Sequence, residues 1–221
     1  MDGIHDMGGM QDWGPVRAPS PGHRPFPEEW EKRAFALALL SRGISGTNLD
    51  AFRHAINRVP PLDYLADGYY GRWLRGAETL LTDSGIIASG AVDARARKLR
   101  GEDVIEPPAP EARRPDYQPT GPGSLRSLGD QPRFSPGDSV RAKDIHPSGH
   151  TRLPRYVRNR IGTVRRVQPA AVFPDTNAHF QGENIQHVYS VGFRSRDLWG
   201  AEAEEFVLNI DLYDSYMEPV R

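Results

Sequence analysis

The chain of 221 residues contains no cysteine, and this absence excludes several kinds of chemistry. Without thiols, a protein can form no disulfide framework, offer no cysteine nucleophile and bind no metal through thiolate sulfur. Any soft metal ion that the function of this protein requires must therefore be held by another chain.

The chain also lacks long apolar runs. No segment approaches the roughly 18 apolar residues of a membrane-spanning helix, and the glycine-rich, acidic start is unlike a signal peptide. We therefore expect a cytoplasmic protein that makes no contact with a membrane. Hydrophobic residues make up 38% of the sequence, which is enough for a folded core, whereas 20 prolines indicate long irregular segments.

The net charge is only −1, but the charges are distributed unevenly. Residues 133–166 hold nine Lys or Arg and two Asp, which gives +7, whereas residues 202–221 hold six Asp or Glu and one Arg, which gives −5. A polarised chain of near-zero total charge suits a complementary protein surface at least as well as a nucleic acid, which usually selects a basic domain. We therefore expect a protein partner and no nucleic acid.

The first segment, residues 1–27, is predicted to be an extended arm. It is rich in Gly and Pro and has no periodic pattern, yet it carries the large apolar residues Ile4, Met7, Met10, Trp13 and Phe26. A solvated tail would rarely keep so many apolar groups, so we expect the arm to lie along a partner. The alternative to a docked arm is a flexible N-terminal segment that binds nothing.

The second segment, residues 28–101, is predicted to be a helical domain, because its apolar residues recur at helical spacing. Thr47 and Asp50 resemble a capping box at the start of one helix, which Pro60 and Pro61 then stop. The expected helices cover residues 28–43, 47–59, 69–85 and 91–99.

The last two segments are a linker and a β-domain. Residues 102–132 contain seven prolines and few aliphatic residues, which is typical of a linker. Residues 133–221 show short alternating apolar runs between Gly, Pro, Asn and Asp, which predict antiparallel strands. The pattern there is similar to that of an SH3-like β-barrel, with Gly137 and Gly162 at turns. The expected fold class is therefore α+β.

The segment GHTRLPRYVR, residues 149–158, combines three arginines and a histidine with apolar or turn-forming residues. Because nearly every other residue favours burial, we expect at least one guanidinium to lie against a desolvated group. Arginine suits this role, since it stays charged, is weakly hydrated and offers a planar fork to oxyanions such as carboxylates, phosphates or sulfur oxyacids.

Three motifs carry a resemblance to a known family. GHTRLPRYVR, together with FPDTNAH at 173–179 and MDGIHDMGGM at 1–10, resembles the β subunit of nitrile hydratase, and the motifs occur in the order of that family. The resemblance implies an enzyme that hydrates nitriles to amides and works only as a heteromer. Its partner would be an α subunit, in an αβ heterodimer or an α2β2 assembly.

The resemblance also implies a metal that this chain does not bind. The α subunit would hold cobalt(III) or iron(III) through cysteine sulfurs and backbone amides, and the metal would act as a Lewis acid on the nitrile. Either a cysteine sulfenate oxygen or an activated water would attack the nitrile carbon.

Two arginines gain a role by this resemblance. From the residues alone, Arg53 is best interpreted as a surface arginine that borders an apolar helix face. In the family, arginines at the positions of Arg53 and Arg152 donate hydrogen bonds to the oxygens of oxidised cysteines on the α subunit. Such oxygens are negatively charged and shielded from water, and charge-assisted hydrogen bonds from arginine compensate for their desolvation.

The resemblance likewise implies half of a substrate pocket. From the residues alone, Tyr69 and Trp73 would be core aromatics, but they match a YYxxW pattern that lines the pocket together with Leu49 and Phe52. The Tyr69 phenol would lie beside the nitrile nitrogen and is counted with the two arginines as catalytic. The sequence departs from the family at two positions, where Asn57 and Gly71 replace acidic residues.

Other candidate sites and functions are weaker. His150, His179 and His187 match no metal-binding spacing, so turn-stabilising or interface histidines are the favoured interpretation. One alternative function is an RNA- or ribosome-associated SH3-like module, although such modules require neither the YYxxW segment nor the arm. Another is a relative of thiocyanate hydrolase, whose subunits divide this architecture between separate chains.

Overall fold

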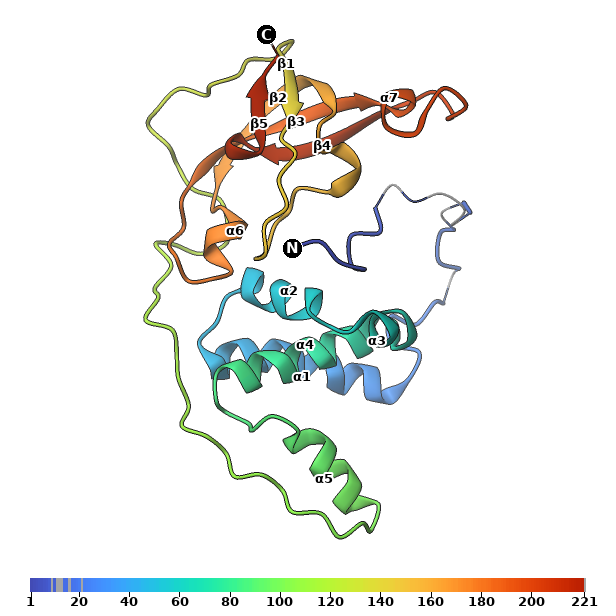
Figure 1. Ribbon diagram of the computed structural model, residues 1–221, viewed down its shortest axis with the longest axis vertical. Helices are drawn as coiled ribbons and strands as arrows, with labels where there is room; N and C mark the ends of the chain where they lie inside the picture. The colour runs from blue at the N-terminus through green and yellow to red at the C-terminus, as the bar shows by residue number, and fades with distance from the viewer. Residues whose placement is uncertain (9, 11–13, 16, 21, 221) are drawn as a thin grey trace. The chain divides into compact units, whose positions relative to one another are not determined.

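The computed structural model describes residues 1–8, 10, 14–15, 17–20 and 22–220, which form two compact units (Figure 1). Unit 1 comprises Met1–Asp2, Asp6–Gln11 and Tyr117–Arg221, and unit 2 comprises Gly3–His5 and Asp12–Asp116. Trp13, one of the apolar residues of the predicted arm, lies outside the described residues. Within the described residues, no helix combines the length and the apolar character that a membrane span requires.

Unit 2 is helical, as the periodicity predicts. Its helices are α1 (Glu29–Ser45), α2 (Leu49–Asn57), α3 (Pro61–Ala66), α4 (Gly68–Asp83) and α5 (Ala91–Leu99). The core between α1, α2 and α4 is made largely of small side chains, among them Ala34, Ala38, Ala55 and Ala77. Small residues allow the helices to approach closely, and the larger side chains of Phe52 and Leu80 are buried beside them.

In unit 2 one local prediction is wrong and one short helix is not predicted. The cap of α2 is Asn48, whose Oδ1 accepts from the Ala51 amide at 2.9 Å, whereas the Thr47 hydroxyl instead contacts that of Ser45 at 2.8 Å. The prolines that stop α2 also begin the unpredicted α3. Pro61 occupies its first turn, where a missing N–H is no loss.

Unit 1 is built on a five-stranded antiparallel sheet with the order β4-β3-β2-β1-β5. The strands are β1 (Ser139–Ala142), β2 (Ile161–Ala171), β3 (Gln186–Arg194), β4 (Val207–Tyr213) and β5 (Met217–Pro219). Short helical segments connect them: η1 (Arg155–Val157), α6 (Pro174–Asn177), α7 (Ser195–Trp199) and η2 (Asp214–Tyr216). The core is formed by fully buried side chains such as Leu153, Tyr189, Phe193 and Tyr216.

The prediction of a closed barrel is wrong, although the α+β class is confirmed. The consecutive strands β4 and β5 form opposite edges of an open sheet, because η2 carries the chain from one to the other. β5 has only three residues and ends at Pro219, which has no N–H for a further ladder bond. Regular alternation in a sequence reveals strands but not whether the outer strands meet.

Gly162 lies inside β2, not at the predicted turn. A Cβ atom at this position would lie 2.7 Å from Cγ1 of Val191 and 2.9 Å from Cε1 of Phe193, so the sheet leaves no room for a side chain. Gly137 does occupy a turn, with a φ of +99° that favours glycine.

The predicted linker is largely irregular, and its C-terminal half is bound to unit 1. Glu183 accepts hydrogen bonds from the Arg126 guanidinium and from both the amide and the hydroxyl of Thr120. The two charged side chains are almost fully enclosed. Hydrogen bonds from Arg126, assisted by those from Thr120, lower the pKa of Glu183 from 4.5 to about 2.

The arm also contacts unit 1 through a group of charges that we call the Asp2 cluster, formed by Asp2, Asp144, His146 and Arg158. Asp2 accepts from Nη1 of Arg158 at 2.7 Å and lies 2.6 Å from Nδ1 of His146. The other ring nitrogen of His146 lies 3.1 Å from Asp144. The hydrogen bond to Asp2, more than the second one to Asp144, raises the pKa of His146.

Replacing Glu183 by Gln should lower the melting temperature of the protein, because it leaves the enclosed Arg126 without a counter-charge. Since the pKa of Glu183 is depressed in the folded state, the stabilisation is complete above about pH 4.5 and disappears as the pH falls towards 2. Thermal melts of wild type and variant should therefore converge in acid. The matched control is Glu205→Gln, whose exposed carboxylate lies 3.6 Å from Arg196. Equal effects of the two substitutions would contradict the prediction.

Raising the pH should loosen the arm. The protonated His146 ring stabilises the contact with Asp2, and its pKa is raised in the folded state. This stabilisation of the arm is therefore present below the ordinary histidine pKa and is lost as the pH rises through the raised value. Amide hydrogen exchange, corrected for intrinsic rates, should show weaker protection of residues 1–8 at about pH 9 than at about pH 6. The change should be smaller in His146→Gln and fully retained in the control His23→Gln. Protection that is constant across this range in wild type would refute the idea.

Candidate functional site

Unit 2 brings three of the predicted pocket residues together. The Phe52 ring on α2 meets Trp73 on α4 edge-to-face at a centroid distance of 5.6 Å, and Tyr69 lies 5.6 Å from Trp73. Phe52 is buried, whereas Tyr69 is 61% exposed, so the group extends from the core to the surface. Leu49 is exposed one helical turn before Phe52, on the same side of α2.

Arg53 directly follows Phe52 on α2. Its Nη1 donates to Oδ1 of Asp50 at 3.2 Å, one turn earlier on the helix. The Arg53 side chain is still 43% exposed. The contact therefore orients the guanidinium and leaves much of it accessible to an external anion.

The aromatic group includes two residues that sequence reasoning missed. Phe35 on α1 lies 5.5 Å from Trp73, and Phe26 lies 4.9 Å from Tyr70. Phe35 stands in the middle of a periodic helix, so its position could have indicated the contact. Phe26 belongs to the predicted arm, where no periodicity assigns a partner.

Gly71, one of the two departures from the family pattern, has a structural reason. A Cβ atom there would lie 2.6 Å from Cβ of Asp67, so a larger residue would collide with the start of α4. The Asp67 carboxylate is itself paired with the Arg75 guanidinium.

In unit 1, Arg152 lies on a loop whose backbone is held firmly. Its amide donates to the Tyr216 hydroxyl at 3.0 Å, and the Thr151 hydroxyl donates to the same oxygen at 3.3 Å. The amide of the buried His150 donates to Nε2 of His179 at 3.0 Å. The backbone is thus fixed on both sides while the Arg152 side chain is exposed.

The three sequence motifs meet at this loop. The Tyr216 hydroxyl donates to Asp175 of the FPDTNAH motif, which also contains His179. The Met1 amine of the first motif donates to the carbonyl of Gly149. Burial raises the pKa of Asp175, and burial together with nearby Asp175 raises the pKa of the Tyr216 hydroxyl. The phenol therefore stays protonated and donates to Asp175.

The guanidinium that lies against a desolvated group is that of Arg158, not Arg152. The Arg158 side chain is 4% exposed, and its anion is Asp2 of the same chain. Its Nη2 also donates to the Leu153 carbonyl at 3.0 Å. Sequence reasoning expected such a group without identifying it. The alternation of charged and apolar residues could not say which arginine faces inwards.

The candidate site residues lie in different units, and the candidate histidines have structural contacts. Arg53 and the aromatic group belong to unit 2 and Arg152 to unit 1, so each part is described by itself. His187 contacts the Asp130 carbonyl at 3.1 Å, which, like the His150–His179 contact, agrees with a turn-stabilising role. Among the described residues, no three imidazoles or carboxylates gather in a way that could hold a metal ion.

Comparisons with known proteins agree with the three motifs. The family profile described as the N-terminal part of the nitrile hydratase β subunit matches residues 1–119, and that of the C-terminal part matches residues 124–219. The nitrile hydratase β subunit of Pseudomonas putida is 38% identical over 221 residues, which cover 99% of this chain and all of that protein.

Two further relatives show how sequence identity and coverage vary. The β subunit of the low-molecular-weight cobalt-containing nitrile hydratase of Rhodococcus rhodochrous is 34% identical and is covered completely. The α subunit of thiocyanate hydrolase from Thiobacillus thioparus is 28% identical over 100 residues, 44% of this chain and 79% of that protein. Only the hydratase subunits of these three match from end to end. The chain belongs to the nitrile hydratase β-subunit family.

Proposed function

We propose that this chain is the β subunit of an enzyme that hydrates small nitriles to amides, with the metal carried by an α subunit. The observation that carries the proposal is the loop that presents Arg152. The structure fixes its backbone through Tyr216 and His179 and leaves the guanidinium exposed. A cation held in this way, with no acidic partner among the described residues, is suited to an anion on another chain.

The proposed anion is an oxidised cysteine of the partner. This chain has no cysteine, so the sulfur must come from elsewhere. Arg152 and Arg53 donate to the sulfenate or sulfinate oxygens, which need several N–H donors once water is excluded from the interface. The Asp50 carboxylate holds Arg53 by one donor, and the rest of the fork is accessible for the task.

The aromatic group forms part of the substrate pocket. Leu49 and Trp73 offer apolar surface to the organic group of the nitrile, with the buried Phe52 packed behind Trp73, and the exposed Tyr69 offers a hydroxyl to its nitrogen. When bound in the α subunit, the metal supplies Lewis acidity toward the nitrile. The relative from Rhodococcus rhodochrous is the β subunit of an enzyme named as cobalt-containing, which supports cobalt(III) over iron(III) here.

The chain purified alone should contain no stoichiometric cobalt or iron and should hydrate no nitrile. The reason is that its described part holds no cluster of metal ligands and its sequence no thiol. Adding the metal-loaded α subunit should produce activity. Elemental analysis and an amide assay before and after mixing test this. A full equivalent of metal together with turnover in the isolated chain would refute the proposal.

Replacing Arg53 or Arg152 by Lys should reduce turnover by about ten- to a hundredfold, because Lys keeps the charge but loses the planar set of donors. Kinetics of the assembled enzyme, with the metal content measured in each variant, provide the test. The control is Arg166→Lys, an exposed arginine of β2. Near-normal turnover in both Arg53→Lys and Arg152→Lys would overturn their assignment. If the chain bound RNA instead, Lys would be tolerated at all three positions.

A further inference from the structure

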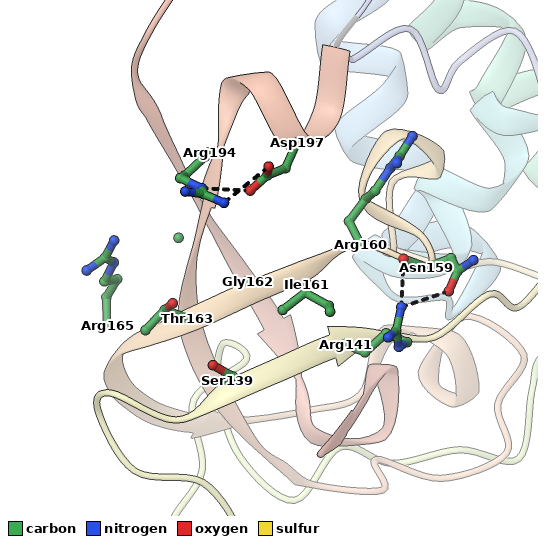
Figure 2. A pocket seen from close by; sticks show the side chains of 11 residues that line it. Ser139, Arg141, Asn159, Arg160, Ile161, Gly162, Thr163, Arg165, Arg194 and Asp197 are labelled. Carbon is green, nitrogen blue, oxygen red and sulfur yellow. Dashed lines mark hydrogen bonds and ion pairs between the residues drawn. The ribbon is translucent and has the colours of Figure 1, made fainter. Parts of the chain in front are cut away.

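A groove in unit 1 is bordered by arginines. It has a volume of about 670 Å³ and is lined by parts of β1, β2, β3 and α7 and by the residues just before β2. Figure 2 shows the four arginines that belong to it, Arg141, Arg160, Arg165 and Arg194. Asp197 is the one acidic side chain among the described lining residues, so the groove has an excess of positive charge.

The floor of the groove is a row of small residues that crosses three strands. Ser139 on β1 is paired with Thr163 on β2, and Thr163 is paired with Gly192 on β3. Residues that are directly opposite one another project from the same face of an antiparallel sheet. Because none of the three has a large side chain, the row leaves a hollow that the longer arginine side chains border.

Two features of the sheet place Arg165 at this groove. The register of β2 against β3 shifts between Val164 and Arg166, and such a bulge re-aims the side chain of the extra residue. Gly192 then leaves room for that side chain to lie across β3, since a Cβ atom at Gly192 would be 2.6 Å from Nε of Arg165. The local backbone and its sequence thus bring an exposed guanidinium to the groove.

The arginines of the groove differ in whether they have an internal counter-charge. Arg194 is paired with Asp197 at 2.8 Å, and Arg141 lies 4.0 Å from a carboxylate oxygen of Glu218. For Arg160 and Arg165, the described residues provide no acidic partner. At least two guanidinium groups of the groove are therefore available to an anion from outside the chain.

The floor adds two neutral donors to these cations. The hydroxyls of Ser139 and Thr163 belong to the lining, and neither has a hydrogen-bond partner in the part of the chain that the structure describes. An anion in the hollow can therefore accept from hydroxyls on the floor and from guanidinium groups at the rim. A carboxylate accepts mainly in its own plane, whereas the oxygens of a phosphate point in several directions. Donors on different sides thus favour a phosphate.

We propose that this groove binds a small molecule that carries more than one phosphate group. Four arginines less the charge of Asp197 leave +3 in the described lining, whereas a single phosphate group carries only about −1.5 to −2 at neutral pH. The volume lies within the range of about 300–1,000 Å³ that is typical of small-molecule sites. The planar forks of Arg160 and Arg165 bind phosphate oxygens, and the Ser139 and Thr163 hydroxyls hold the ligand from the floor.

An extended nucleic acid fits the groove less well. No described lining residue is aromatic, so the groove offers no ring on which a base could stack. The turn that follows α7 also carries three exposed carboxylates, those of Glu202, Glu204 and Glu205. They would repel a strand that continued past α7, but they lie outside the lining that a compact ligand contacts.

The first test is isothermal titration calorimetry of the full chain with inorganic tripolyphosphate, at about 150 mM salt so that diffuse attraction is screened. Binding should be saturable and should involve one class of site. Arg160→Gln combined with Arg165→Gln should weaken it at least about tenfold, because both available guanidinium groups are lost. The control Arg166→Gln removes an exposed arginine of the same strand that does not line the groove, and it should bind as the wild type does.

The second test distinguishes a built site from general attraction to positive charge. Ser139→Ala combined with Thr163→Val removes both hydroxyls but no charge, and it should weaken binding about tenfold. Thr163→Ser keeps the hydroxyl and should bind normally. Thermal melts without ligand check that each variant is folded. Unchanged affinity in the folded double variant without hydroxyls would contradict the proposal.

Other ligands and the assembled enzyme complete the test. Citrate, a multivalent carboxylate, should bind more weakly than tripolyphosphate, and the titration should give the same affinity when the α subunit is present. The proposal is overturned if the wild type shows no saturable binding, if citrate binds as tightly, or if Arg166→Gln loses as much affinity as the groove variant. It is also overturned if a single-stranded RNA of about 20 nucleotides binds the groove more tightly than tripolyphosphate, or if the α subunit abolishes binding. Nitrile hydration is not measured, so the result is independent of the proposed function.

Discussion

A guanidinium removed from water needs an anion, and this constraint determines how the parts of unit 1 that lack regular structure are held. Arg158 lies beneath the loop that carries Arg152, and its anion is Asp2, which brings the start of the arm onto the sheet domain. Arg126 lies in the irregular segment before β1, and its anion is Glu183 near the start of β3. Leaving either arginine unpaired would destabilise the fold. A buried guanidinium that loses its carboxylate is still removed from water, but it no longer gains the Coulomb attraction that offsets this cost. Segments with few backbone bonds of their own thus acquire defined positions.

The same constraint bears on Arg152, whose proposed anion lies outside the chain. Arg152 has a rigid backbone and an exposed head, which is the reverse of Arg158 six residues later. The difference originates in the core, since the buried Leu153 and Val157 direct the intervening chain into η1 and turn Arg158 inwards. The Arg152 amide in turn donates a hydrogen bond to the Tyr216 hydroxyl, which holds the backbone in place. Packing of apolar residues therefore decides which arginine is buried and which stays exposed.

The helices could be predicted well from the sequence, because their apolar spacing, caps and stops are local signals. The start of α2 at Asn48 and the existence of α3 could not, since Thr47 and Asn48 are both good caps and Pro61 can end one helix or begin another. The strands followed from alternation, but closure of the sheet depends on which edges meet, and alternation does not encode that. Gly162 was misplaced for a related reason, because its close neighbours lie on β3, far away in sequence.

The site shows the same division between local and distant information. From the residues alone, Arg53 was best interpreted as a surface side chain, and its exposure and contact with Asp50 agree with that description as far as this chain by itself is concerned. The aromatic contact between Phe52 and Trp73 was implied only by resemblance to the family. A half-exposed arginine beside a group of aromatics has no need of an anion within its own fold. The role proposed for Arg53 follows from the missing thiols. A chain without cysteine can act on an oxidised sulfur only across an interface, and for that purpose its donors must remain at the surface.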